Sequence, residues 1–207
     1  MKEIKETCYK GTRILIGDNK RAIINRMIDI LYKEGFVEIS IPIIQYREIF
    51  LGKVGEENNN LMFNFKDRGD RDLCLAPEYT AVCQRLAKTT FKNEKDVKLF
   101  YVQECFRGEK PQAGRYRQFT QLGVEILNPT GIYQDTYYIY LANRLIGGGY
   151  ITNSNVVRGL DYYKGGKGFE IRSKEGMQIC GGGEYEGGYG FAIGIDRLEY
   201  NTKEPTI

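Results

Sequence analysis

The sequence predicts an α+β fold in which helices flank a mostly antiparallel sheet. Strand-like runs follow one another across loops of hairpin length, and only a few segments have the 3.6-residue apolar period of a helix. The chain has 207 residues, of which 42% are hydrophobic and 28% charged, which is the composition of an ordinary globular protein. We therefore expect a single domain, residues 1–207, with a core of its own.

In the first half of the chain, helical and strand-like patterns alternate. The first helix has its expected N-cap at Asp18 and ends at Gly35. The strand that follows ends at Pro42, because proline suits a strand end or a sheet edge. Gly69-Asp70 is the expected turn of a hairpin. The expected elements are a helix over 19–34, a strand over 36–42, a hairpin of 61–66 with 71–76, and a helix over 80–88.

The second half begins with two strand-like runs on either side of a basic, polar loop, residues 107–117. A helical segment follows and ends at the three glycines 147–149. The remaining chain is rich in glycine and strand-like. The expected elements are strands over 98–106 and 119–126, a helix over 133–146, and strands over 155–163, 168–172, 176–181 and 189–195.

The composition excludes several classes of function. The chain contains no histidine, so a Ser–His or Cys–His nucleophile is impossible. Its five cysteines are scattered without a CxxC pair, and we expect no zinc or other protein-built metal centre. No apolar run approaches the ~20 residues that span a bilayer, and the first residues lack an apolar signal core, so we expect a cytosolic protein without membrane contact. A net charge of +3 does not by itself imply nucleic acid.

The most informative segment is 105–125. Arg107 ends one strand and Glu109 follows in the loop, while Gln121 and Glu125 lie four residues apart on the next strand and so share one face of it. A polar pair on the inner face of a sheet is unusual unless it binds something. The alternative is a solvated hairpin with an exposed basic tip.

Two further segments suggest a binding site. Arg158 lies in an apolar strand-like run beside Asp161, and a buried arginine needs an anion, either a ligand phosphate or a structural partner such as Asp161. The glycines of 179–199 leave room for a flat ligand or a backbone to approach, and Arg197 follows them. The P-loop pattern GxxxxGK[ST] is absent.

Taken in this order, the segments resemble the motifs of class II aminoacyl-tRNA synthetases, and specifically of histidyl-tRNA synthetase. The resemblance covers the whole chain. It comprises residues 35–42 for motif 1, 106–119 with 121–125 for motif 2, 190–197 for motif 3, 158–163 and 182–187 for the two histidine-specific motifs, and 75–80 for the family's Pro-Glu-Gly-Thr element.

The resemblance implies histidine and ATP as substrates, with Mg²⁺, and assigns residues to them. The implied catalytic residues are Arg107, Arg158 and Arg197. The implied ATP-binding residues are Arg107 at the α-phosphate, Glu109 at the adenine, Arg115, Phe119, and Arg197 at the γ-phosphate. The implied histidine-binding residues are Glu78 and Gln121 at the ammonium, Arg158 as a bridge between the carboxylate and the α-phosphate, Glu125 and Tyr163 at the imidazole, and Tyr162 and Tyr185.

The implied chemistry suits a protein without histidine. When a substrate carboxylate attacks an α-phosphate, charge builds on phosphate oxygens, and fixed guanidinium groups with Mg²⁺ stabilise it. The carboxylate is already ionised, so no general base is needed.

The chain also departs from the family. We expect that it is a minimal core, without the family's helical insertion before Arg158 and without its anticodon-binding domain. Glu184 stands where the family has arginine, a charge reversal that we expect to lie beside the pocket, and Asp196 stands where it has glutamate. Gly108 and Thr120 occupy two positions of motif 2 that are usually histidine.

Two functions remain open. The first is an enzyme that makes histidyl-adenylate and passes histidine to the acceptor stem of tRNA-His, which the loop bearing Lys110 and Arg117 would approach, or to another carrier. The alternative is a histidine sensor that resembles the regulatory subunit of ATP phosphoribosyltransferase, against which the three retained arginines argue. We expect a homodimer through residues 35–45.

Overall fold

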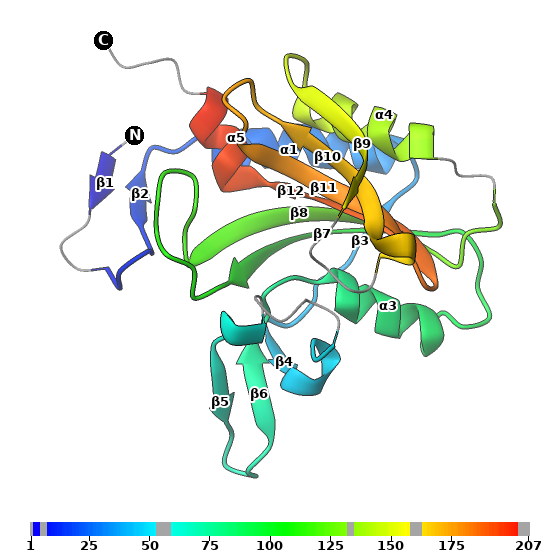
Figure 1. Ribbon diagram of the computed structural model, residues 1–207, viewed down its shortest axis with the longest axis horizontal. Helices are drawn as coiled ribbons and strands as arrows, with labels where there is room; N and C mark the ends of the chain where they lie inside the picture. Colours follow the sequence, from blue (N-terminus) through cyan, green and yellow to red (C-terminus); the bar gives the residue numbers. More distant parts are fainter. Residues whose placement is uncertain (1, 5–7, 53–58, 132–134, 158–162, 203–207) are drawn as a thin grey trace.

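The computed structural model describes residues 2–4, 8–52, 59–131, 135–157 and 163–202, and its main feature is a seven-stranded sheet (Figure 1). All neighbouring strands are antiparallel except β3 and β7, which run parallel. In spatial order the strands are β3 (Val37–Glu38), β7 (Val97–Phe106), β8 (Gln118–Leu127), β12 (Gly188–Gly194), β11 (Gln178–Tyr185), β10 (Lys167–Arg172) and β9 (Ile151–Val157). The predicted α+β class and the mostly antiparallel sheet are confirmed.

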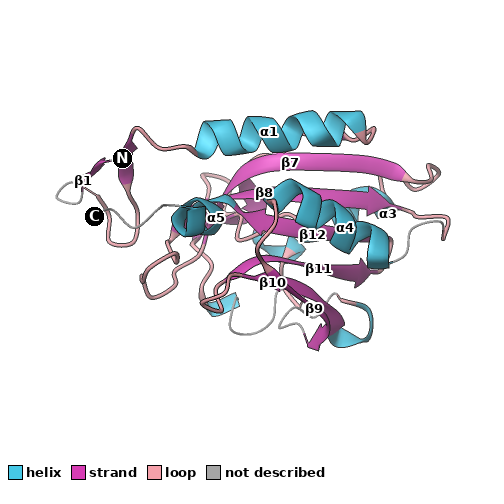
Figure 2. Ribbon diagram, turned by 90° about the horizontal axis from the view of Figure 1, so that it is seen from above, coloured by secondary structure: helices cyan, strands magenta, loops and turns pink. Residues whose placement is uncertain are grey.

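Helices cover both faces of the sheet (Figure 2). On one face, α1 (Lys20–Lys33), α4 (Asp135–Ile146) and α5 (Ile195–Thr202) pack over a core that includes Leu122 and Val124 of β8. On the other face, α3 (Thr80–Lys88) packs with Tyr101, Cys105 and Tyr185. Successive residues of a strand point to opposite faces, so Phe119, Gln121, Gly123 and Glu125 lie on the α3 face.

A smaller three-stranded sheet projects below the main one (Figure 1). Its strands run in the order β4 (Ile44–Tyr46), β6 (Asp72–Leu75) and β5 (Asn64–Lys66), and the short helix η1 (Arg47–Ile49) follows β4. Near the N-terminus, β1 (Lys2–Ile4) pairs with β2 (Ile14–Ile16). A second short helix, η2 (Lys164–Gly166), precedes β10. Within the described ranges, no helix has both the length and the apolarity to cross a bilayer.

Most predicted elements are confirmed to within a few residues, including the helix over 80–88 and the hairpin of β5 and β6. The first helix is confirmed, but its N-cap is Asn19 and not Asp18. The Asn19 side chain makes no capping bond; its backbone N–H donates to Glu199 Oε1 at 3.1 Å. Tertiary contact with α5 therefore replaces a local cap.

Three predicted strands need correction, and several short elements were missed. The strand over 36–42 shortens to the two residues of β3, because after Ile39 the chain leaves β7 and enters the smaller sheet. The strand over 155–163 is β9, which ends at Val157, and residues 158–162 lie outside the described part. The expected strand over 189–195 ends at Gly194, because Ile195 begins α5, a helix that was not predicted. The short strands β1, β2 and β4 were not predicted either.

Candidate active site

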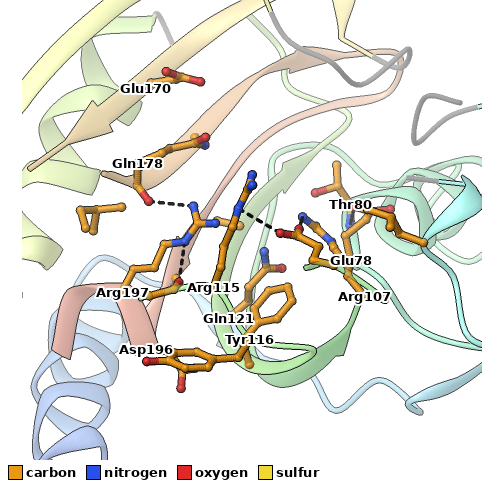
Figure 3. A pocket seen from close by; sticks show the side chains of 18 of the residues that line it. Glu78, Thr80, Arg107, Arg115, Tyr116, Gln121, Glu170, Gln178, Asp196 and Arg197 are labelled. Carbon is orange, nitrogen blue, oxygen red and sulfur yellow. Dashed lines mark hydrogen bonds and ion pairs between the residues drawn. The ribbon is translucent and has the colours of Figure 1, made fainter. Parts of the chain in front are cut away.

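A cleft of about 480 Å³ opens beside the α3 face of the sheet, between the basic loop 107–117, strands β8, β10, β11 and β12, and the start of α5 (Figure 3). Eight of the predicted site residues line it. They are Glu78, Arg107, Glu109, Arg115, Phe119, Gln121, Tyr163 and Arg197. Segments far apart in the sequence therefore meet at one cleft.

Three arginines converge on this cleft. The Nε of Arg107 donates to the carbonyl of Pro77 at 2.8 Å, and its guanidinium lies over the Phe119 ring, 5.3 Å from the centroid. Arg197 donates from Nε to the carbonyl of Gly114 at 3.1 Å and from a terminal nitrogen to the carbonyl of Gln178 at 3.0 Å (Figure 3). Backbone carbonyls thus orient both side chains, and a terminal nitrogen of Arg107 also lies 3.9 Å from Oε1 of Glu109.

The pKa of Arg197 reflects its burial and the guanidinium groups around it. Burial is the main cause that lowers this pKa, and the neighbouring guanidinium groups of Arg115, Arg107 and Arg172 lower it further, while Glu109 opposes them. An arginine stays protonated despite such a shift. The cost of crowding like charges is recovered when a polyanion binds, so the cleft suits phosphate groups.

Two carboxylates accompany the arginines. Glu109 is 13% exposed, and its Oε2 lies 2.9 Å from Nε of Arg115, an ion pair that lacks the angle of a hydrogen bond. Glu170 on β10 is buried at the cleft and accepts a 2.8 Å hydrogen bond from Nε of Arg172. Glu170 was not predicted as a site residue. In the sequence, it could have been found only as a carboxylate between two apolar residues of the strand expected over 168–172.

Glu125 is fully buried behind the cleft. Its Oε1 accepts from the Thr80 hydroxyl at 2.9 Å and its Oε2 from the Tyr185 hydroxyl at 2.7 Å. Burial raises the pKa of Glu125 to about 8, although both hydrogen bonds lower it, and the nearby Glu78 raises it slightly. Thr80 lines the cleft and touches Glu125, so it joins the buried acid to the open site. Thr80 was not predicted as a site residue.

Glu78 performs a structural task as well as lining the cleft. Its two carboxylate oxygens accept from the backbone N–H groups of Thr80, at 2.7 Å, and Ala81, at 3.0 Å. A carboxylate at this position satisfies the first amides of α3 and interacts favourably with the helix dipole. Each oxygen keeps a further lone pair for a ligand.

The remaining predicted residues have different outcomes. Gln121 accepts from Cys105 Sγ at 3.2 Å, and Tyr163 forms a backbone bridge with Tyr185. Arg158 and Tyr162 lie outside the described residues, as does the predicted pair of Arg158 with Asp161.

The expectation that Glu184 reverses a charge beside the pocket is wrong. Glu184 and Tyr185 are neighbours on β11, so their side chains point to opposite faces, and Tyr185 lies on the Glu125 side. Glu184 is exposed and pairs with Lys164 at 2.8 Å. The charge reversal is therefore compensated at the surface.

The glycine prediction is correct only in part. Gly181 and Gly194 line the cleft, as expected for close approach of a ligand. The space over Gly123 and Gly190, in contrast, is filled by side chains of the protein. A Cβ at Gly190 would lie 1.8 Å from Glu125 Oε2, so this glycine makes room for the buried acid.

Comparison with known proteins agrees with the geometry. The family model of histidyl-tRNA synthetase matches residues 18–148, which is more than half of the chain. The chain belongs to the histidyl-tRNA synthetase family. It is 40% identical over 132 residues to the histidine–tRNA ligase of Ureaplasma urealyticum, and 38% identical over 145 residues to that of Archaeoglobus fulgidus.

These alignments cover 61% and 66% of this chain but only 31% and 34% of the two ligases, so the chain matches about a third of each synthetase. Solved structures cover more of it. The apo histidyl-tRNA synthetase of S. aureus has a TM-score of 0.72 at 25% identity, covering 98% of this chain and 73% of that one. A Bacillus halodurans protein described as an ATP phosphoribosyltransferase regulatory subunit/histidyl-tRNA synthetase has a TM-score of 0.78 at 16% identity, covering 99% and 85%. The predicted synthetase-type fold is thus confirmed.

Proposed function

We propose that this chain activates histidine with ATP to form histidyl-adenylate and pyrophosphate. The observation that carries the proposal is the junction of two environments at Thr80. A buried acid, Glu125, lies on one side of it, and a cleft lined by three arginines lies on the other. Histidine can span this junction. Its imidazole offers a polar group to Glu125, and its carboxylate can reach the α-phosphate of an ATP molecule bound among the arginines.

The reaction needs positioning and charge rather than proton transfer. A carboxylate oxygen of histidine would attack the α-phosphorus of ATP, and the bond to the bridging oxygen of the β-phosphate would break, releasing pyrophosphate. Arg107 and Arg158 would stabilise the charge on the α-phosphate, and Arg115 and Arg197 that on the leaving group. Glu109 and Phe119 would hold the adenine, the first by a hydrogen bond and the second by stacking.

Histidine selection would depend on Glu125. Its carboxyl group can pair with an imidazole nitrogen, while Tyr185 and Thr80 orient it. Glu78, Gln121 and Tyr163 line the cleft. The first two would take the ammonium group and Tyr163 would contact the imidazole, with Tyr162 as a further histidine-binding residue. An analogue that lacks the imidazole nitrogens would leave Glu125 unpaired, so such a pocket rejects it strongly.

The residues present fit Mg²⁺ in the way nucleotide sites use it. Within the described residues, no group of three Cys, Asp or Glu side chains could hold an ion by itself. Mg²⁺ in such sites takes one or two carboxylates and completes its shell with phosphates and water. Glu170, buried at the cleft, would supply the carboxylate. The ion would neutralise charge on the polyphosphate.

The acceptor of the activated histidine would be the acceptor stem of tRNA-His or another carrier. Lys110 is exposed at the basic loop and would contact a phosphate backbone. Arg117 is less suited to this role, because one terminal nitrogen donates to Tyr9 and Lys10 and its Nε donates to the carbonyl of Glu109.

We also propose a homodimer through the segment that begins at β3. A groove of about 570 Å³ there is lined mainly by apolar side chains, among them the exposed Pro42 and Ile44. Neighbouring β4 adds the exposed Tyr46. A second copy would cover these side chains, as an isologous interface does.

The second candidate is a histidine-sensing regulatory protein, in view of the fold shared with the Bacillus halodurans protein. One assay separates the two functions: histidine-dependent exchange of pyrophosphate into ATP on the purified chain, without tRNA and with the other amino acids as controls. Exchange with histidine alone supports the enzyme. Absence of exchange, together with histidine binding detected by calorimetry, would support the sensor instead.

A further inference from the structure

Residues 9–13, which we call the N-terminal arm, lie directly against the basic loop 107–117. The backbone N–H of Arg117 donates to the carbonyl of Gly11 at 2.7 Å. One terminal nitrogen of Arg117 donates to the Tyr9 hydroxyl at 2.8 Å and to the carbonyl of Lys10 at 3.1 Å, while its Nε donates to the carbonyl of Glu109 at 3.1 Å. Arg117 thus joins the arm to both sides of the loop.

The backbone of the arm packs closely against the loop at Gly11. Gly11 has φ of +90°, a conformation that favours glycine. A Cβ on Gly11 would lie 2.8 Å from Cγ of Pro111 and 2.9 Å from Cγ of Arg117. Both the conformation and the contact therefore require glycine at this position.

At its other end the arm joins the loop to α5. The Arg13 side chain is only 8% exposed, and its guanidinium lies over the Tyr116 ring, 3.4 Å from the centroid. The same guanidinium forms an ion pair with Asp196, which immediately precedes Arg197. Asp196 in turn accepts from the backbone N–H of Thr120 on β8 at 2.6 Å. Tyr116 and Asp196 both line the cleft (Figure 3).

The ion pair alone does not explain the position of Arg13. Asp196 also pairs with Lys20 at 2.7 Å and accepts the Thr120 amide, so its charge has partners without Arg13. What Arg13 adds is the stacked contact of its guanidinium with the Tyr116 ring. A planar guanidinium can stack and form an ion pair at the same time.

We propose that the N-terminal arm positions the basic loop over the cleft, with Arg13 as its principal positioning residue. The loop carries Glu109 and Arg115, whose proposed partner is ATP, so this inference rests on the proposed function. A loop with several conformations would bind ATP only from the competent fraction, and the affinity would fall by that fraction. The arm therefore sets the KM for ATP and leaves that for histidine nearly unchanged, because Glu125 and Thr80 are not part of the loop and are held to each other by their own hydrogen bond.

The test compares Arg13→Ala with Lys20→Ala, a matched control that removes the other cation on Asp196. In pyrophosphate exchange, we expect Arg13→Ala to raise the KM for ATP about tenfold, the size of a lost desolvated cation–π contact, with the KM for histidine within about twofold. We expect Arg13→Lys to recover part of the loss and Lys20→Ala to change neither KM. Equal effects of Arg13→Ala and Lys20→Ala, or equal rises in both KM values, would overturn the proposal.

Hydrogen exchange of the ligand-free protein provides a readout that does not depend on activity. We expect Arg13→Ala and Tyr9→Leu to speed amide exchange in residues 107–117 while α1 keeps its protection, which shows that the variants are folded. Unchanged exchange in the loop would contradict the arm's role. If the wild-type chain lacks pyrophosphate exchange but Arg13→Ala still frees the loop, the proposed function fails and the arm's role stands.

Discussion

At the scale of single residues, Glu125 is the most unusual group in the molecule. It is a fully buried carboxyl group whose two oxygens accept from Thr80 and Tyr185, with Glu78 nearby. The hydrogen bonds favour the ionised form and burial favours the neutral form. Burial outweighs them, because the pKa is about 8 and not the ordinary 4.5.

This raised pKa predicts how stability depends on pH. Between pH 4.5 and about 8, the folded protein keeps a proton on Glu125 that the unfolded chain has released, so the free energy of unfolding falls as pH rises through this window. The contribution is fully present below the window and is lost above it. At ~1.4 kcal/mol per pKa unit, the contribution of Glu125 to the free energy of unfolding is on the order of 3–5 kcal/mol.

Urea unfolding of the wild type and of Glu125→Gln at several pH values checks this prediction. Glutamine keeps the shape and does not titrate, so the difference between the two proteins isolates Glu125 from other groups. We expect the difference in the free energy of unfolding between the wild type and Glu125→Gln to favour the wild type most at low pH and to shrink as pH rises. Parallel curves would show that Glu125 titrates normally.

At the scale of elements, β8 is matched to both of its neighbours so that a large polar side chain faces a glycine. Gly190 of β12 pairs with Glu125 of β8 across one ladder. In the other ladder Gly123 of β8 pairs with Tyr101 of β7 and gives room to its ring, since a Cβ on Gly123 would lie 2.0 Å from Cζ. Strands without these glycines could not hold a buried acid and a buried tyrosine on the α3 face of the sheet.

Gly190→Ala is therefore expected to displace Glu125. Overpacking of a tight core costs about 1–3 kcal/mol of the free energy of unfolding. The matched control for stability is Gly194→Ala on the same strand, where a Cβ would have its nearest neighbour at 3.7 Å. Chemical denaturation should show a loss for Gly190→Ala and little change for Gly194→Ala. In pyrophosphate exchange, Gly190→Ala should raise the KM for histidine more than the KM for ATP. A larger rise in the KM for ATP would place the ATP site nearer Gly190 on β12 than we propose.

At the scale of the whole molecule, the proposed homodimer rests on the exposed apolar side chains near β4. Ile44 is 51% exposed beside the apolar groove. Ile151 on β9, at the far edge of the main sheet, is equally exposed at 51%. The two isoleucines form a matched pair for testing which surface mediates association.

Ile44→Asp should convert a dimer to a monomer, because a buried, unpaired carboxylate opposes association. Ile151→Asp should leave the oligomeric state unchanged. Light scattering coupled to size exclusion measures both at the same protein concentration. A wild-type monomer would contradict the dimer, and dissociation by Ile151→Asp would place the interface on β9 instead.

Periodicity and local turn chemistry were sufficient to predict most of the secondary structure. The helix over 80–88 and the strands that became β7 and β8 carry strong patterns in contiguous residues. The predicted strand over 36–42 was too long. Alternation of apolar and polar residues shows that a segment can pair in a sheet, but it does not show over how many residues a neighbouring strand lies beside it. The N-cap failed because a distant glutamate, Glu199, reaches Asn19.

The sequence by itself determined the fold class, the family and the residue types of the site, because motif spacing and apolar period are properties of the linear chain. Only the tertiary structure decided which groups meet. It placed Thr80 against Glu125, turned Glu184 toward Lys164, and joined Arg13 to both Tyr116 and Asp196. These contacts cross tens to nearly two hundred positions of sequence. The physical reason is that burial and charge pairing depend on distances in space, which local pattern does not contain.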